Sequence, residues 1–409
     1  MNVRTVLTNL GSLGNIQPFL ALGAELRRYG YDPVFALAPQ YGDYVRKLDF
    51  EFVPVGWEID YQNLQKRDTA SELRGGDPLH LFRKSLGTLS AMLPEMYAQL
   101  NHVCRRADLL LSGHLQPVSR IIHELTRIPF VSVHTSHFGG LQPPAFRQTA
   151  CAIINPFRAK CGLPPVQDPI HTDANSDQLA LYAMSRYLRP PGPNWPSHYH
   201  VTGFFFLPEE GLDPDPGLTA FVEAGPPAVV FTFSSIVHED PRAITELLLE
   251  ALDGLDCRAV ILSGWSRLGG AVKMPPWVHV APFVQHSWLF PRAACVVHAG
   301  GSGTTAMTLR SGIPAIVVPH VGDQPIWAEL VRGIGCAKYV LPYQGLNARQ
   351  LREALSHTLN DPFLYRNAAS MAVKIREEQG VASARRLIDQ LVFRAGPGTG
   401  PKHNTVSIA

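Results

Sequence analysis

The sequence lacks the features that mark secreted, membrane-spanning or zinc-binding proteins. Its six cysteines are scattered over 409 residues, without the close pairs of a metal site or the density of a disulfide scaffold. No apolar run reaches the length of a membrane span, and the first residues lack a charged region followed by an apolar signal core. We therefore expect a reduced, cytoplasmic protein whose contact with a membrane is at most peripheral.

The chain also has no large excess of positive or negative charge, which argues against a nucleic-acid partner. The chain has 36 basic and 34 acidic residues, a formal net charge of +2. No cluster of lysine and arginine interleaves with aromatic residues, as a nucleic-acid surface would require. The sequence has no Gly-Lys-Ser/Thr, so it contains no P-loop.

The length and the opening of the chain predict two α/β domains. A chain of 409 residues exceeds one ordinary domain. Residues 3–8 resemble a buried strand, a glycine-containing loop follows, and apolar residues at three- and four-residue spacing predict a helix from about Pro18 to Gly30. Residues 33–37 are the next predicted strand. This order is typical of a doubly wound parallel sheet.

The most informative stretch lies in the C-terminal half and repeats that order. An apolar strand over residues 293–297 is followed by His298, a glycine-rich loop over 299–303 and a helix from Thr304 to Ser311. Glycines let the backbone approach a ligand closely. The start of a helix offers unpaired N–H groups and the positive end of the helix dipole. The stretch therefore predicts a phosphate site.

A polar pair follows the next apolar run, residues 315–318. Asp323 and Gln324 should lie at the same carboxyl edge of a parallel sheet, where a carboxylate and an amide suit sugar hydroxyls. Two other interpretations stay open on spacing alone. Residues 301–306 fit G-x-G-x-x-A with Asp323 about 20 residues on, as in dinucleotide sites. Alternatively, the glycines only pack a helix on a strand, and His298 is a core histidine.

The density of matching residues favours a sugar nucleotide. The segment resembles the donor-binding signature of the nucleotide-sugar glycosyltransferases with the GT-B fold, in the branch of sterol glucosyltransferases and bacterial natural-product glycosyltransferases. The matching runs are His286-Ser-Trp-Leu-Phe-Pro291, Val297-His-Ala-Gly-Gly-Ser-Gly-Thr-Thr305, Leu309-Arg-Ser-Gly-Ile-Pro314 and Gly322-Asp-Gln-Pro-Ile-Trp327. The fold that this resemblance implies is two doubly wound Rossmann-like domains facing across a cleft.

The resemblance also implies roles for individual residues. The histidine and the glycine loop hold the diphosphate, the Asp-Gln pair contacts the sugar, and the positions before the signature contact the nucleoside. Carried over, the donor residues are Phe283, Val284, Gln285, His298, Gly300, Gly301, Ser302, Gly303, Thr304, Asp323 and Gln324. Ser235 and Trp265 match positions near the donor, although the run Thr232-Phe-Ser-Ser235 lacks the glycines that the family has there.

A second motif, at the N-terminus, departs from the family at one position. Residues Gly11, Ser12 and Gly14 match its N-terminal loop, but Asn15 stands where the family carries the aspartate or histidine that deprotonates the acceptor. An amide has no useful basicity at neutral pH. Three explanations stay open: His134 or His137 supplies the base, the acceptor is acidic enough to need little help, or the protein only binds.

Residues 200–208 resemble the strand that leads into the interdomain linker of this family, and the resemblance sets the predicted domain limits. We expect an acceptor-binding domain over residues 1–203, a linker over 204–227 and a donor-binding domain over 228–385. A helix over 386–395 should return to the first domain, and residues 396–409 are predicted to be a disordered tail. Residues 142–169, which contain several prolines, are predicted to be a loop with short helices.

The expected function is that of an inverting glycosyltransferase that needs no metal and no cofactor. The resemblance implies UDP-glucose as donor, with a dTDP-sugar second, and a hydrophobic acceptor such as a sterol, terpenoid or polyketide. A nucleotide-sugar 2-epimerase and a catalytically silent sugar-nucleotide-binding protein stay open as alternatives. The oligomeric state does not follow from the sequence.

Overall fold

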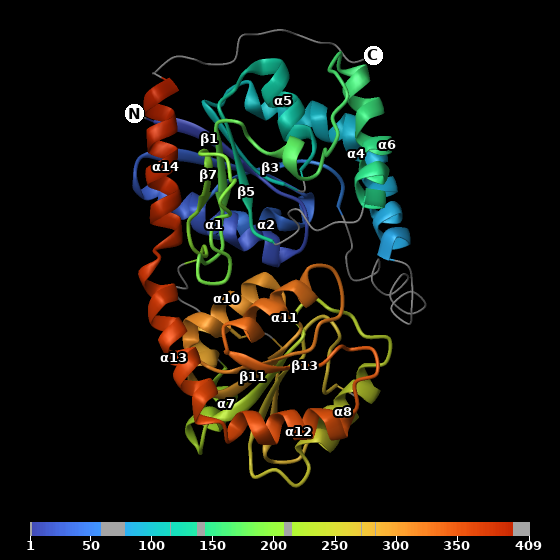
Figure 1. Ribbon diagram of the computed structural model, residues 1–409, viewed down its shortest axis with the longest axis vertical. Coiled ribbons are helices and arrows are strands. Elements are labelled where there is room, and N and C mark those ends of the chain that lie inside the picture. The colour runs from blue at the N-terminus through green and yellow to red at the C-terminus, as the bar shows by residue number, and fades with distance from the viewer. Residues whose placement is uncertain are drawn as a thin grey trace.

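The chain forms two parallel β-sheets, each covered by helices on both faces (Figure 1). The computed structural model describes residues 2–58, 78–114, 116–136, 144–207, 215–270, 272–282 and 284–395. In Figure 1 the first unit lies above the second, and the last helices run along one side of both. The predicted pair of doubly wound, Rossmann-like α/β units is confirmed.

The first sheet contains seven strands in the order β3-β2-β1-β4-β5-β6-β7, all parallel. The strands are β1 Val3–Thr8, β2 Tyr31–Leu37, β3 Glu51–Pro54, β4 Leu109–Gly113, β5 Phe130–His134, β6 Leu179–Tyr182 and β7 Tyr199–Val201. The helices of this unit are α1 Leu13–Arg28, α2 Gly42–Lys47, α4 Pro78–Cys104, α5 Val118–Thr126 and α6 Pro144–Lys160, with short 3-10 turns η1 Pro39–Tyr41 and η2 Thr172–Ala174.

The second sheet contains six strands in the order β10-β9-β8-β11-β12-β13, again parallel. The strands are β8 Ala228–Thr232, β9 Ala259–Leu262, β10 Val278–Ala281, β11 Ala293–His298, β12 Ala315–Val317 and β13 Ala337–Val340. The helices are α7 Pro216–Glu223, α8 Pro241–Leu252, α9 His286–Leu289, α10 Ser302–Ser311, α11 Gln324–Gly333, α12 Ala348–Leu359, α13 Pro362–Glu377 and α14 Gly380–Ala395, with the turn η3 Phe290–Arg292.

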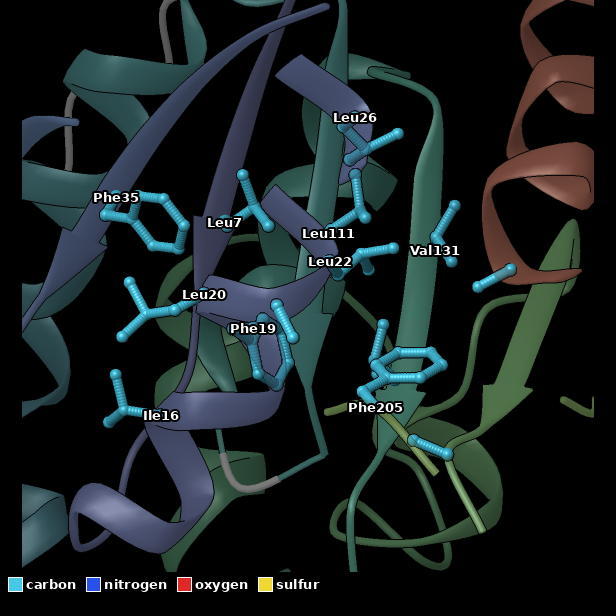
Figure 2. Packing of buried hydrophobic residues seen from close by; sticks show 14 of the residues in the cluster. Leu7, Ile16, Phe19, Leu20, Leu22, Leu26, Phe35, Leu111, Val131 and Phe205 are labelled. Carbon is cyan, nitrogen blue, oxygen red and sulfur yellow. The ribbon is translucent and has the colours of Figure 1, made fainter. Parts of the chain in front are cut away.

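Buried apolar residues on both faces of the sheets hold each unit together, as expected for parallel strands. Leu7 and Leu111 point from β1 and β4 into a cluster with α1, whose Phe19, Leu22 and Leu26 are fully buried (Figure 2). The opposite face of the sheet packs against α4, α5 and α6. Because α1 begins at the carboxyl edge of β1, this packing fixes where its first turn lies.

The two units share a third apolar cluster. Phe204, just beyond β7, packs against Trp327 of α11, with ring centroids 6.0 Å apart. Met184 and Leu188 of the first unit join Leu309 of α10 in the same cluster. Helix α1 also contacts α10. Since both helices begin at carboxyl edges of their sheets, these contacts bring the two edges toward one another.

The chain returns from the second unit to the first at residues 378–380. Glu378 accepts hydrogen bonds from the Ser185 hydroxyl (3.0 Å) and the Arg186 N–H (2.9 Å), and burial raises the pKa of its carboxyl. Helix α14 then packs against α1, with Ala384 and Ile388 inside the first core. The returning helix thus begins at Gly380, earlier than the predicted range 386–395.

Two local predictions about helices differ from the structure. Helix α1 begins at Leu13, so Pro18 lies inside it. The helix continues across the proline because Ile16, Phe19 and Leu20 on either side of it are fully buried. Residues 144–160 form the single helix α6 instead of loops with short helices. Its buried Ala150, Ile154 and Phe157 have helical spacing, and this packing outweighs the internal Pro156.

Only part of the predicted linker, residues 204–227, connects the two units. Helix α7 lies within it, and its fully buried Leu218 packs into the core of the second unit. Asp215 caps this helix by accepting from the Leu218 N–H at 2.9 Å. The described part of the connection between the units is therefore residues 202–207, which include Phe204.

Gly380→Ala should destabilise the protein. A Cβ atom at this position would lie 2.2 Å from the carbonyl oxygen of Phe204 and 2.6 Å from that of Gly203, and neither backbone can move without disturbing the junction of the units. We expect a loss of about 1–3 kcal/mol or more, seen as a lower Tm. Gly87→Ala is the control, since its Cβ would meet nothing within 4 Å on the exposed side of α4. An unchanged Tm for Gly380→Ala would contradict the close packing at this crossing.

Candidate active site

Strand β11 places His298 at the carboxyl edge of the second sheet, and the side chain is fully buried. Its Nδ1 accepts a hydrogen bond from the Gly300 N–H at 3.0 Å. Burial, with a smaller effect of His286, lowers its pKa to about 3. A neutral imidazole that accepts at Nδ1 carries its proton on Nε2. That Nε2 has no partner among the described residues, so it is a buried donor ready for an acceptor atom.

The start of α10 lies directly after this histidine. Gly301 is the N-cap residue, and no side chain caps the helix. A Cβ atom on Gly301 or Gly303 would meet nothing within 4 Å, so the space in front of the helix is open. The first N–H groups of a helix have no partner within it and carry positive partial charge. The geometry suits an anionic group such as a phosphate.

Gly300 has a different role from its neighbours. Its φ of +87° lies in the left-handed region. A Cβ atom here would lie 2.9 Å from Cγ1 of Val317 and 3.0 Å from the carbonyl oxygen of Gln324. Gly300 therefore allows the turn after β11 to pack against β12 and α11.

The loop after β8 reaches the same helix end through Ser234. The Ser234 hydroxyl lies 3.4 Å from that of Thr304. Ser234 adopts a positive φ of 49°, and its carbonyl oxygen accepts from the Trp265 N–H at 3.1 Å. The structure thus places Ser234 beside α10, whereas the sequence predicts this role for Ser235. Ser235 is the next residue and is half-buried. Trp265 is held at the edge of the site by this backbone contact.

Asp323 and Gln324 begin α11, and both have contacts within the protein. The Asp323 carboxylate accepts from the Trp327 indole N–H at 2.8 Å. The Gln324 side-chain oxygen accepts from the backbone N–H groups of His320 (2.8 Å) and Val321 (3.0 Å). These bonds fix the loop. They also occupy the side-chain oxygen of Gln324, so the NH₂ group is the part of this side chain that can donate a hydrogen bond.

The predicted nucleoside contacts lie before α9. Val284 is buried in the apolar cluster of α7, α9 and β10. Gln285 is the N-cap residue of α9, and its carbonyl oxygen accepts from the Trp288 and Leu289 N–H groups, both at 3.1 Å. Phe283 lies outside the described residues.

In the first unit, Asn15 lies in the first turn of α1. The Asn15 N–H donates to the Ser12 carbonyl at 2.8 Å, and the Asn15 carbonyl accepts from Nδ2 of Asn9 at 2.9 Å. A Cβ on Gly11, whose φ is +116°, would lie 2.5 Å from Nδ2 of Asn15, so the amide packs over this glycine. Gly14, by contrast, is exposed on the helix.

His134, one of the two predicted alternatives for a base, is a buried part of an aromatic stack. Its ring lies parallel to those of Tyr182 (4.4 Å between centroids) and His114 (5.1 Å). Its Nε2 is 2.6 Å from Oδ1 of Asn175, which can only accept, so Nε2 carries the proton. Burial lowers the pKa of His134 to about 4. His137, the other alternative, lies outside the described residues.

A groove of about 530 Å³ adjoins the donor loops on the α8 side of the sheet. Its floor includes His238 and His320, whose Nε2 atoms are 3.1 Å apart. The His320 ring stacks on Tyr343 at 4.2 Å. These residues and His114 are not among the site residues that the sequence predicts. Their only signal is that each follows an apolar strand by a few residues.

No helix in the described ranges is both long enough and apolar enough to cross a bilayer.

Comparison with known proteins shows what the chain is similar to. Residues 246–383 match the family model described as "Erythromycin biosynthesis protein CIII-like, C-terminal domain". The chain resembles the glycotransferase of kitacinnamycin in structure, with a TM-score of 0.77 over 96% of this chain and 100% of that one at 19% identity. This structural likeness shows the fold.

Two curated relatives align along nearly the whole chain. Sterol 3-beta-glucosyltransferase UGT80A2 of Arabidopsis thaliana is 26% identical over 93% of this chain and 64% of the relative. O-mycaminosyltylonolide 6-deoxyallosyltransferase of Streptomyces fradiae is 28% identical over 95% of this chain and 97% of the relative. The chain thus spans about two thirds of the plant relative and nearly all of the bacterial one.

The two-sheet architecture and the structural likeness give the chain the GT-B fold, and its two curated relatives are glycosyltransferases. By these alignments the chain is related to the sterol glucosyltransferases and to the Streptomyces natural-product glycosyltransferases.

Stability should fall in mild acid because several buried histidines are held neutral. Burial lowers the pKa of His134, His238 and His286 to about 4 and that of His298 and His320 to about 3. In the unfolded chain these groups titrate near 6.5. Between those values the unfolded state binds more protons, so each group costs up to about 1.4 kcal/mol per pH unit as pH falls below about 6.5.

We therefore expect a Tm that is nearly constant from about pH 7 to pH 8 and falls steadily below about pH 6.5. His238→Gln removes one titrating group and should make the fall shallower, which separates the histidine contribution from that of carboxylates. Parallel profiles for the wild type and His238→Gln would contradict a neutral buried His238.

Proposed function

We propose that the protein transfers a hexose from a nucleotide sugar to a hydroxyl of a hydrophobic small molecule. The observation that carries this proposal is the open N-terminus of α10 with the unpartnered Nε2 donor of His298 beside it. A departing diphosphate fits this arrangement, since its charge would meet helix N–H groups, a buried imidazole N–H and nearby hydroxyls.

The relatives support the kinds of substrate. The name of one describes transfer of glucose to a sterol, and that of the other describes transfer of a 6-deoxyallosyl group to O-mycaminosyltylonolide. On this basis the donor is UDP-glucose, with a dTDP-sugar as the second choice. The acceptor belongs to the sterol, terpenoid or polyketide type.

The proposed mechanism is a direct displacement in the cleft between the two units. An acceptor oxygen attacks C1 of the sugar from the face opposite the diphosphate, the C1–O bond to the diphosphate breaks, and the anomeric configuration inverts. Ser302, Thr304 and Ser234 place hydroxyls around the leaving group. In this proposal the carboxylate of Asp323 and the NH₂ group of Gln324 bind sugar hydroxyls, and their other bonds within the protein hold the two side chains in place.

In this proposal each of the two units binds one of the two substrates. The acceptor lies against the first unit, residues 1–203, and the donor against the second, residues 228–385. Helix α14 packs against the first unit, so in this proposal it supports the acceptor-binding unit, although it follows the donor-binding unit in the chain.

The direct test is product formation. Purified protein is incubated with UDP-glucose, or with a dTDP-sugar, and a panel of sterols, terpenoids and polyketide aglycones, and masses are recorded. A mass gain of one sugar on an acceptor, with release of the nucleoside diphosphate, is expected. An isomerised sugar nucleotide formed without acceptor, or tight nucleotide binding with no product from any pair, would overturn the proposal.

A matched pair of glycine substitutions tests the diphosphate position. Gly301→Ala keeps an allowed backbone (φ −62°) and meets no protein atom, but its methyl group would occupy the space proposed for the diphosphate. We expect unchanged Tm and at least about 10-fold weaker UDP or dTDP binding by calorimetry, about 1.4 kcal/mol. Gly300→Ala should instead lower Tm, because of its positive φ and short contacts. Wild-type affinity in folded Gly301→Ala would place the diphosphate elsewhere.

His298→Ala should weaken nucleotide diphosphate binding by about 10-fold or more, because a buried charge-assisted hydrogen bond is lost. His102→Ala, on the exposed face of α4, is the control and should bind like the wild type. Unchanged binding in a folded His298→Ala protein would mean that Nε2 does not face the ligand.

A further inference from the structure

The proposed transfer needs a group that takes the acceptor proton, and Asn15 cannot do so. The loop that carries Asn15 has a neighbour, however. Strands β1 and β4 are paired in parallel, with Thr8 opposite Ser112. The turn after β4 therefore lies beside the turn after β1, at the same edge of the sheet.

Two contacts show that the turns after these strands touch. A Cβ on Gly113 would lie only 1.8 Å from Oδ1 of Asn9, so the Gly113 backbone packs directly on the Asn9 side chain. That side chain also holds the Asn15 carbonyl. Nε2 of Gln116 donates to the Thr8 hydroxyl at 3.3 Å. His114, which directly follows Gly113, thus sits beside the Asn15 turn.

The His114 ring is held in one orientation. It is 4% exposed and stacks on His134 with an angle of 13° between the ring planes. Its Nε2 lies 3.3 Å from the Ser136 hydroxyl, at the end of the neighbouring strand β5. Because His134 uses its Nε2–H on Asn175 and is packed against Tyr182, it serves as a platform for His114.

The ring is in the form that a base requires. Burial, together with His134 and His171, keeps the pKa of His114 well below 6.5, so the imidazole is neutral at physiological pH. A neutral ring can accept a proton, and Ser136 offers the Nε2 atom a hydroxyl partner in the resting protein.

We propose that His114 is the catalytic base that stands in for the residue missing at Asn15. This inference rests on the proposed sugar transfer. Nε2 of His114 takes the proton of the acceptor hydroxyl as the acceptor oxygen forms its bond to C1 of the sugar. The bond from C1 to the diphosphate oxygen breaks, and its electron pair leaves with the nucleoside diphosphate. The imidazolium returns its proton to water after product release. Asn15 orients the acceptor hydroxyl by hydrogen bonding.

The test asks whether a carboxylate at position 15 can replace the histidine. His114→Gln keeps a polar side chain that can bond Ser136 but cannot take up a proton, and kcat should fall about 100-fold or more. Asn15→Asp alone is measured beside it as the single-variant reference for the double variant. The double variant Asn15→Asp/His114→Gln should recover to within about 10-fold of the wild type, because general-base catalysis contributes about 10²–10⁴-fold and the new carboxylate restores it.

His123→Gln is the matched control. His123 is also a buried neutral histidine of the first unit, and its Nδ1 lies 2.7 Å from the Ile128 carbonyl on the way into β5, at the opposite edge of the sheet. This variant should leave kcat close to that of the wild type, whatever its effect on Tm. Nucleotide binding should be unchanged in every variant, since the donor residues lie in the other unit.

The outcomes separate the two proposals. An unchanged kcat for His114→Gln, or a large loss that Asn15→Asp does not restore, overturns the role of His114 and leaves the proposed function standing. A wild-type protein that binds nucleotide and transfers sugar to no acceptor overturns the proposed function, and this inference with it. Loss followed by recovery in the double variant supports both.

Discussion

The packing of Trp327 is the interaction on which the arrangement of the two units and of the site depends. Its indole ring is fully buried at the junction of the units, against Phe204 of the first. Its N–H binds the carboxylate of Asp323 at the start of the same helix. One side chain therefore contacts both the first unit and a polar group at the candidate sugar site. A change in the domain junction would be transmitted to that carboxylate through a single rigid ring.

Much of the donor half could be predicted from the sequence because its geometry is local. The histidine lies between a predicted strand and a glycine-rich loop that leads into a helix, all within about a dozen residues. This spacing can only place the histidine next to the start of the helix. Gly312 ends α10 in the left-handed conformation, as its position in the sequence indicates. The bonds of Gln324 could not be foreseen, since its partners are backbone N–H groups whose direction depends on the folded loop.

The acceptor half was harder to predict because its contacts join residues far apart in the chain. His114, His134 and Tyr182 come from three different segments and meet only when β4, β5 and β6 align in the sheet. A sequence shows each as an isolated polar or aromatic residue at a strand end. Likewise, Ser234 rather than Ser235 reaches Thr304 because the backbone at Ser234 turns into the left-handed region, which only the fold reveals. Helix α6 was missed because its prolines suggested a break that burial overrides.

The return of helix α14 to the first sheet has a consequence for how the protein is made. Ala384 and Ile388 are part of the core that β1 and α1 begin, and Tyr31 of β2 donates its hydroxyl to Asp389 at 2.7 Å. During translation the N-terminal part of a chain leaves the ribosome first and commonly folds first. Here the first sheet remains without one of its covering helices until α14 has been synthesised, so the unit that is begun first is completed only after the chain of the second unit.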